Sequence, residues 1–357
     1  MKKRSIIILF LSVILHPLFP QEHLSRVITT DSLYLAPLPE NPRTSEGAFI
    51  RLKNNDILMV NTKFTGGSGD HDAASLIGRI SKNEGKTWSK EILVAANEGS
   101  MNIMSVSLLR LQNGNIALFY LVKNQTNDCY PVMRISKDES VSWSSPVSCI
   151  PPGTGYYVLN NNRVLQLENG RIIVPVSCHS KGSLSFREDG VISCIYSDDN
   201  GVSWSESQPM KGPEGVIKQE PGVIPLKDGR LLMYVRTKSH FQYFSYSKDN
   251  GQTWTEAVQG TLQSARSPAL ILRNPFTKDL VAVWNDHPTE RTPLCIAVSK
   301  DDGQTWTNKK SIENNPGLWY CYPALEFLAP DMALVSYCFG DKKKWGLEGM
   351  MIRKIKF

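Results

Sequence analysis

Ser247-Lys-Asp-Asn-Gly-Gln-Thr-Trp254 is one of five copies of an octet that recurs along this chain of 357 residues. In the octet, an Asp or Asn side chain can accept hydrogen bonds from backbone N–H groups, and Gly tolerates a positive φ. Trp can then pack back onto a sheet, so the octet predicts a tight hairpin turn. A strand-like apolar run precedes each copy. The other copies begin at Ser81, Ser136, Ser197 and Ser299, so successive starts are 55, 61, 50 and 52 residues apart.

A second hairpin signal lies between the octets. Leu167-Glu-Asn-Gly-Arg-Ile-Ile173 is typical of strand, polar turn and strand, and related segments begin at Leu52, Leu111 and Leu226. Each unit of about 50 residues thus holds two hairpins, which make the four strands of one propeller blade. Five octets mark five blades. Strand-like runs at residues 324–327 and 333–338, with an N-terminal strand near residues 33–38, can complete a sixth. The sequence therefore predicts an all-β fold, a single six-bladed β-propeller.

Composition narrows the class of protein. A hydrophobic fraction of 41% excludes wholesale disorder, and a dispersed net charge of +6 argues against a nucleic-acid partner. Seven Cys without a close CxxC pair argue against a zinc ribbon or a disulfide-dense scaffold, although Cys129 with Cys149 and Cys178 with Cys194 are candidate disulfides. The chain has no P-loop, no GxGxxG after a strand and no HExxH, so no cofactor is expected.

The N-terminus has the pattern of a targeting segment. Lys2-Lys3-Arg4 precedes an apolar run over residues 5–15, which ends at His16-Pro17. The run is too short to span a bilayer of about 30 Å as a helix. We therefore expect a signal peptide at residues 1–21 and a propeller catalytic domain at residues 22–357, exported to the periplasm or outside the cell without membrane insertion of the mature chain. An uncleaved anchor or a buried terminal strand is the alternative.

The octets resemble the Asp boxes, or BNR repeats, of sialidases, where they lie at the blade periphery away from the central pocket. A more specific likeness lies in Glu220-Pro-Gly-Val-Ile-Pro-Leu-Lys-Asp-Gly-Arg-Leu-Leu-Met-Tyr-Val-Arg236. It resembles the sialidase pattern in which a Glu begins one strand and an Arg ends the hairpin sixteen residues later. The resemblance covers roughly residues 40–340. It implies that Glu220 polarises a catalytic tyrosine and that Arg236 helps to bind a substrate carboxylate.

Three further segments follow in the family's order. Arg43 and Arg291 resemble the first and third arginines of the carboxylate-binding triad. Tyr322, in Trp319-Tyr-Cys-Tyr-Pro-Ala-Leu325, resembles the tyrosine nucleophile. Tyr320 lies two residues away on the same strand face, so either tyrosine could point inward, and the other would then pack in the core or line the pocket. A neutral phenol suits a substrate whose own carboxylate, at the anomeric carbon, would repel an anionic nucleophile.

The general acid has three candidates in one glycine-rich loop, residues 65–74. Asp70 is the first candidate by its position, and Asp72 is the second. His71 could act as an acid or a base near neutral pH. A cation site formed by the three is an alternative. The family's late glutamate, which supports the first arginine, has no evident match around residues 336–340, and Glu46 could substitute for it.

Together these features predict a retaining exo-glycosidase of sialidase type. Its partner would be a glycan with a terminal carboxylated sugar, a sialic acid or a related ulosonic acid. One alternative is a lyase or glycosidase for uronate-containing glycans, which would use His71 with the arginines. Another is a non-catalytic propeller that binds glycans.

Overall fold

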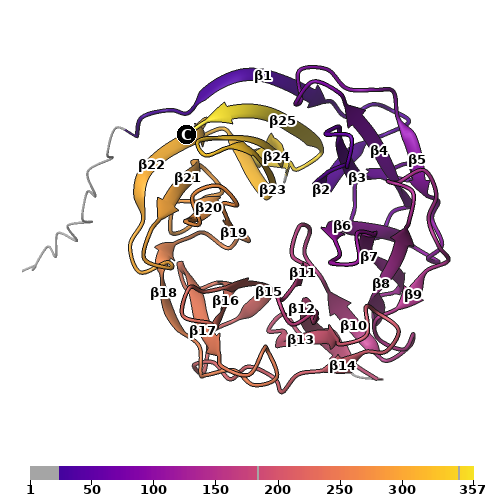
Figure 1. The fold of residues 1–357 in the computed structure, drawn as a ribbon, viewed down its shortest axis with the longest axis vertical. Helices are drawn as coiled ribbons and strands as arrows, with labels where there is room; N and C mark the ends of the chain where they lie inside the picture. Colours follow the sequence, from indigo (N-terminus) through magenta and orange to yellow (C-terminus); the bar gives the residue numbers. More distant parts are fainter. Residues whose placement is uncertain (1–23, 183–184, 345) are drawn as a thin grey trace, which may run out of the picture.

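A computed structural model describes residues 24–182, 185–344 and 346–357, and the expected signal peptide lies outside them. The described chain is almost entirely β-structure, and its only helical turn in those ranges is the 3-10 helix Lys342–Lys344. Figure 1 shows the strands arranged as a ring of blades around a central axis. The all-β propeller prediction is therefore confirmed.

The blades follow one another along the chain. Blade 1 contains β2 (Arg43–Arg51), β3 (Ile57–Phe64), β4 (Ala74–Ser81) and β5 (Ile92–Ala95). Blade 2 contains β6 (Asn102–Arg110), β7 (Ile116–Gln125), β8 (Asp128–Ser136) and β9 (Val147–Ser148). Blade 3 contains β10 (Gly155–Val158), β11 (Leu165–Gln166), β12 (Ile172–Lys181), β13 (Val191–Ser197) and β14 (Ser205–Glu206). One parallel pair, Tyr156 of β10 with Cys129 of β8, joins blades 2 and 3 into a nine-stranded sheet.

The second half of the ring repeats this plan. Blade 4 contains β15 (Lys218–Pro225), β16 (Leu231–Thr237), β17 (Phe241–Ser247) and β18 (Val258–Gln263). Blade 5 contains β19 (Leu270–Arg273), β20 (Leu280–Asn285), β21 (Leu294–Ser299) and β22 (Thr307–Glu313). Blade 6 contains β23 (Leu318–Ala329), β24 (Met332–Asp341), β25 (Gly349–Lys356) and β1 (Ile28–Leu35).

The ring closes through the first strand. β1 pairs antiparallel with β25, from Ile28 opposite Lys356 to Leu35 opposite Met350, so the sixth blade is built from both ends of the described chain (Figure 1). This pairing joins both ends of the described chain in one blade, in which β1 is the outer edge strand. The N-terminal strand was expected near residues 33–38. It lies a few residues earlier because its partner is β25, which the sequence patterns did not reveal.

The octets form the turns between the third and fourth strands of blades 1 to 5. In the third octet, Ser197 Oγ accepts the Gly201 N–H at 2.7 Å and Asp199 Oδ1 accepts the Ser203 N–H at 2.8 Å. Gly201 has a φ of 90° and lies against Met133 of blade 2, where a Cβ would collide with the Met133 side chain. The octets are therefore structural turns that also pack one blade against the preceding one.

Strand direction separates these turns from the other end of the ring. In a four-stranded antiparallel blade, the 1–2 and 3–4 turns lie on one face and the 2–3 turn lies on the opposite face. The octets consequently lie on the face opposite the 2–3 loops and the starts of the first strands. Apolar layers between neighbouring blades form the core, as where Val60 and Leu76 pack with Ile103 and Tyr120.

The seven cysteines are buried and unpaired, which corrects both candidate disulfides. On the β12–β13 ladder, Cys178 lies opposite Val191 whereas Cys194 lies opposite Pro175, so their side chains are offset along the strands. Beside β8, the Cys149 N–H donates to the carbonyl of Pro131 rather than to that of Cys129, which again is an offset.

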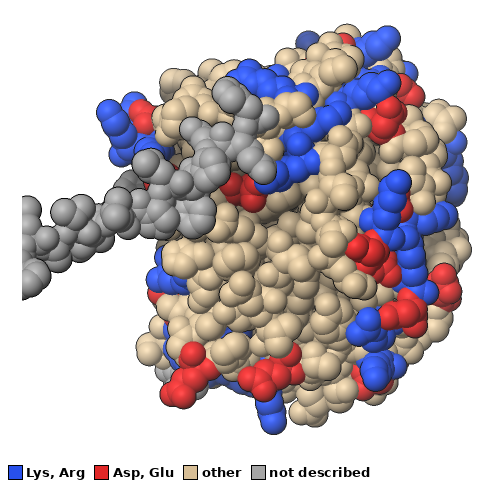
Figure 2. All heavy atoms as spheres, turned by 90° about the vertical axis from the view of Figure 1, so that its left-hand side faces the viewer, with Lys and Arg blue, Asp and Glu red and all other residues tan. Residues whose placement is uncertain are grey.

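Charge is mixed on the side of the ring that Figure 2 displays. Basic and acidic side chains are interspersed there, and a broad uncharged area lies between them. In the described ranges, no helix has the length and apolar character needed to cross a membrane.

Candidate active site

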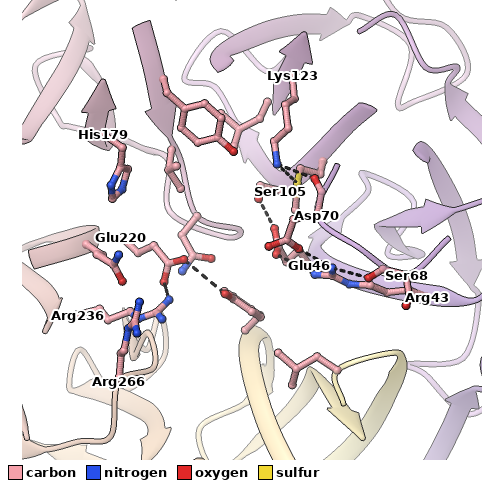
Figure 3. Close-up of a pocket in the computed structure, with 18 of the residues that line it drawn as sticks. Arg43, Glu46, Ser68, Asp70, Ser105, Lys123, His179, Glu220, Arg236 and Arg266 are labelled. Atoms are coloured by element: carbon pink, nitrogen blue, oxygen red, sulfur yellow. Dashed lines mark hydrogen bonds and ion pairs between the residues drawn. The ribbon is translucent and has the colours of Figure 1, made fainter. Parts of the chain in front are cut away.

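A pocket of about 480 Å³ opens where the first strands of the blades begin and the 2–3 loops turn (Figure 3). Basic side chains outnumber acidic ones among the described residues of its wall, by six to four, which suits an anionic ligand. The basic residues are Arg43, Lys123, Arg236, Arg266, Arg291 and Lys344, and the acidic ones are Glu46, Asp70, Glu220 and Glu348.

Four of the lining side chains come from one irregularity that is repeated in four blades. The pairing register shifts within β2, β6, β15 and β23, just where each strand enters the pocket. A bulge redirects a side chain, and a non-glycine residue with positive φ costs of order 1–3 kcal/mol. The residues at these bulges are Glu46, Ser105, Glu220 and Tyr322, with φ of 47°, 63°, 44° and 55°.

Tyr322, Glu220 and Arg236 form a continuous chain of contacts, of which Figure 3 labels Glu220 and Arg236. The Tyr322 hydroxyl donates to Glu220 Oε1 at 3.5 Å, and Glu220 Oε2 accepts a hydrogen bond from Arg236 Nη1. Burial, and then the negative charge of Glu220, raise the pKa of Tyr322 well above its ordinary value. A tyrosine of that kind stays neutral until a base in contact takes its proton, and Glu220 is placed to be that base.

Tyr320 does not line the pocket, which corrects the expectation that it does. Its side chain is 2% exposed and packs against Tyr337 and Phe339 of β24, with ring centroids 5.9 and 6.2 Å away. The register shift between Cys321 and Ala324 separates the two tyrosines, so residues two apart on one strand do not share a face here.

Arg43 organises the opposite wall of the pocket (Figure 3). Its Nη1 donates to Asp70 Oδ1 at 2.5 Å and to the Ser68 carbonyl at 3.2 Å. Glu46 Oε1 lies 3.8 Å from Nη2, so Glu46 does lie beside the first arginine. Burial raises the pKa of Glu46 to about 7, although Arg43 and a hydrogen bond from Ser105 act in the other direction.

The glycine-rich loop brings only one of its three candidates into the pocket wall. Asp70 lines the pocket. Burial acts to raise its pKa, but the contact with Arg43 outweighs this and lowers it. The Asp72 carboxylate instead accepts the Gly69 N–H at 2.7 Å and caps the turn. His71 is exposed and absent from the wall, so neither a lyase base nor a cation site has support from these contacts. In the described part of the chain, no group of three His, Cys, Asp or Glu side chains is arranged to hold a metal ion.

Arg291 lies in the loop between β20 and β21 and lines the same pocket. Its Nη2 donates to the carbonyl of Arg266 at 3.1 Å, and its guanidinium lies 5.4 Å from the Trp319 ring centroid. With Arg43 and Arg236, it completes the expected set of three arginines around one cavity.

Several lining residues escaped the sequence analysis. Arg266, Lys123, Ser105, His179 and Phe186 belong to no motif, and their neighbours in sequence carry no catalytic pattern. The fold alone brings them together, because they belong to blades 2 and 3 and to the link between blades 4 and 5. For Ser105, one signal was available: it occupies the same position near the start of a first strand as Glu46, Glu220 and Tyr322 do.

The sequence of this chain is similar to those of known proteins. The family model for the BNR repeat-like domain matches residues 59–329. An anhydrosialidase of Macrobdella decora is 27% identical over 273 residues, which is 68% of this chain and 34% of that protein. A sialidase of Paraclostridium sordellii is 33% identical over 180 residues, 42% of this chain and 43% of that protein.

The fold also matches solved structures. The structure of a Hadza microbial sialidase superimposes with a TM-score of 0.74 at 15% identity, covering 89% of this chain and 66% of that one. At that identity the likeness concerns the fold alone. The chain spans less than half of the length of the two curated relatives named above.

Proposed function

The chain belongs to the sialidase superfamily of BNR-repeat β-propellers, and on that basis we propose that it is a retaining exo-glycosidase. It removes a terminal carboxylated sugar, a sialic acid or a related ulosonic acid, from a glycan. The observation that carries this proposal is the contact chain from Tyr322 through Glu220 to Arg236 at the wall of a cationic pocket.

Binding begins with the substrate carboxylate. Guanidinium groups pair with carboxylates in a planar, bidentate manner and keep their charge in a partly desolvated site. Arg43, Arg236 and Arg291 supply such groups from blades 1, 4 and 5. The excess of basic side chains around them favours an anionic sugar over a neutral one.

The first chemical step transfers the sugar to the enzyme. Glu220 takes the proton of Tyr322, and the phenolate oxygen attacks the anomeric carbon as the glycosidic C–O bond breaks. Asp70 donates a proton to the departing oxygen, so the aglycone leaves as a neutral alcohol. Tyrosine-nucleophile enzymes of this type are an exception to the pairing of two carboxylates in glycosidases.

The second step releases the sugar. Asp70, now a carboxylate, takes a proton from a water molecule, and the resulting hydroxide attacks the anomeric carbon from the side that the aglycone left. The bond to Tyr322 breaks, and Glu220 returns the proton to the phenol oxygen. Two displacements at one carbon give net retention of configuration.

The site of action is part of the proposal. The basic start and apolar run of residues 1–21 support a signal peptide, and residues 22–357 would then be the catalytic domain in an exported protein. Mass spectrometry of the N-terminus of protein secreted by its own host tests this point. A mature chain that still begins at Met1 would contradict it.

Product analysis tests the activity. The purified chain is mixed with sialosides of different linkages and with uronate-capped oligosaccharides, and proton NMR follows the products. A free ulosonic acid that appears first as the retained anomer supports the proposal. A ring-closed anhydro sugar would keep the tyrosine step but replace water by the sugar's own hydroxyl. An unsaturated uronate, or no product from any sialoside, would contradict the proposal.

A further inference from the structure

The main chain of Asp70 is held by two side chains from blade 2. Lys123 Nζ donates to the Asp70 carbonyl at 2.7 Å, and Asn102 Nδ2 donates to the same carbonyl at 2.9 Å. Asn102 also donates to the Asp72 carbonyl at 2.9 Å, so it bridges both ends of the Asp70–Asp72 turn. Figure 3 shows the Lys123 ammonium group directed at Asp70 from the neighbouring blade.

Lys123 is an unusual residue for this position. It lies near the end of β7 and is 3% exposed, and burying an ammonium group without a charged partner is unfavourable. Its hydrogen bond to Met104 Sδ is 3.5 Å long, and the Tyr156 ring centroid lies 5.7 Å away. The charge of Lys123 also acts on the Asp70 carboxylate, whose pKa it helps to lower. The shortest hydrogen bond of the ammonium, and the carboxylate on which its charge acts, therefore both belong to Asp70.

The loop that carries Asp70 requires an external support. It contains Gly66, Gly67 and Gly69 within five residues, and glycine leaves the backbone with more conformational freedom than any other residue. Without the two donors from blade 2, the position of the Asp70 main chain would depend on the Asp70 side chain, on the contact of Arg43 with the Ser68 carbonyl and on turn contacts within the loop.

The Asp70 side chain must itself move during the proposed reaction. In the structure its carboxylate accepts a hydrogen bond from Arg43, the arginine that is expected to bind the substrate carboxylate. An incoming carboxylate competes for the same guanidinium and frees Asp70. The freed carboxyl then loses the contact that lowers its pKa, so it can hold a proton for the leaving group.

We propose that Lys123, with Asn102, is a positioning residue for the general acid: it fixes the Asp70 main chain while the carboxyl turns from Arg43 to the leaving-group oxygen. The inference rests on the proposed role of Asp70 as acid and base. It adds two residues of blade 2 to the catalytic apparatus, although neither needs to touch the sugar.

The leaving group provides a test. The Lys123→Met variant is compared with the wild type on two substrates. In the first, the sialic acid is linked to the hydroxyl of another sugar, and this leaving group needs a proton to depart. The second is a 4-nitrophenyl sialoside, whose leaving group departs without a proton. A general acid contributes about 10²–10⁴-fold, so losing part of its alignment should cost about 10- to 100-fold in kcat/KM with the sugar leaving group. The loss with 4-nitrophenol should stay below about threefold by the same reasoning. Asp70→Asn gives the full pattern for reference.

Two further variants separate positioning from general damage. Lys123→Arg keeps a cationic donor and should recover most of the lost activity. Lys354→Met removes another buried ammonium, which donates to Glu84 of the first octet at 3.0 Å. This variant should lower the activities on both substrates equally or not at all. An equal loss on both substrates in Lys123→Met, or no loss, would overturn the inference.

A structural measurement distinguishes failure of this inference from failure of the proposed function. If the wild type cleaves neither sialoside, the proposed function fails, and hydrogen exchange of the peptide spanning residues 65–73 then decides whether the loop is anchored. Faster exchange in Lys123→Met than in Lys354→Met supports anchoring by Lys123. Equal exchange in the two variants overturns it.

Discussion

Tyr322 lies 102 residues from Glu220 in sequence, yet its hydroxyl donates to Glu220 Oε1 at 3.5 Å across the centre of the ring. Both residues occupy bulges at the start of a first strand, in blades 6 and 4, and both have positive φ. The strain of these two backbones is held by the surrounding sheets, and it aims a phenol and a carboxylate at each other.

Removing the phenol oxygen should stop the reaction. We expect Tyr322→Phe to lower kcat by more than about 10³-fold, because the nucleophile is lost, while KM changes by less than about threefold. Steady-state kinetics with a sialoside measures both constants. Tyr320→Phe is the matched control, since Tyr320 lies in the core, and its kcat should stay near that of the wild type. Substantial turnover by Tyr322→Phe would remove Tyr322 from the mechanism.

Arg236 should be intolerant of a lysine. It is buried and binds Glu220, and in the proposed mechanism its remaining donors bind the substrate carboxylate. Lysine offers a point charge in place of a planar fork, and a displaced charge at a buried pair costs of order 2–3 kcal/mol, or about 30- to 160-fold in kcat/KM. Arg230→Lys is the control, because Arg230 pairs with Asp228 in an exposed turn. Equal kcat/KM for the two variants would argue against carboxylate binding at Arg236.

Glu46 should make the fold less stable as pH rises from about 4.5 to 7. Burial raises its pKa from 4.5 to about 7 in the folded chain, so over this interval the unfolded chain has lost the proton that the folded chain still binds. The free energy of unfolding therefore falls with rising pH, by about 3 kcal/mol across the whole interval.

Glu46→Gln tests this prediction, because the amide resembles the protonated acid and does not titrate. Urea unfolding at several pH values should show a weaker loss of stability above pH 4.5 in the variant than in the wild type. Glu326, whose pKa burial also raises to about 7, remains in both proteins, so it cancels from the comparison. Parallel pH curves for the two proteins would show that Glu46 is not protonated in the fold.

The octets should matter for stability and not for turnover. Gly201 has a φ of 90° and faces Met133 of the preceding blade, so Gly201→Ala adds both backbone strain and a collision. We expect a loss of about 1–3 kcal/mol in the free energy of unfolding, with kcat and KM unchanged. Chemical denaturation and kinetics on the same preparation measure the two effects. A selective loss of kcat at full stability would place the third octet in the active site.

The chain's repeats determined the blades without help from the tertiary structure. The chemistry of each octet turn is local: Ser197, Asp199 and Gly201 contact one another within five residues, so the pattern is readable directly. The same holds for the polar turns between first and second strands. Glu220 and Arg236 could also be paired from the sequence, because they lie at the two ends of one hairpin: Gln219 lies opposite Arg236, and Glu220 occupies the bulge next to it.

Only the tertiary structure decided which side chains meet in the pocket. Tyr320 and Tyr322 could not be separated by pattern, because a bulge in β23 sends one into the core and the other to Glu220. Among the three acid candidates of the loop, only the tertiary structure singles out Asp70, because Arg43 of β2 binds its carboxylate. Lys123 carried no signal at all, since its partner belongs to another blade. Local turns are encoded by neighbours in sequence, whereas the site is formed by contacts between blades, and those depend on how the ring closes.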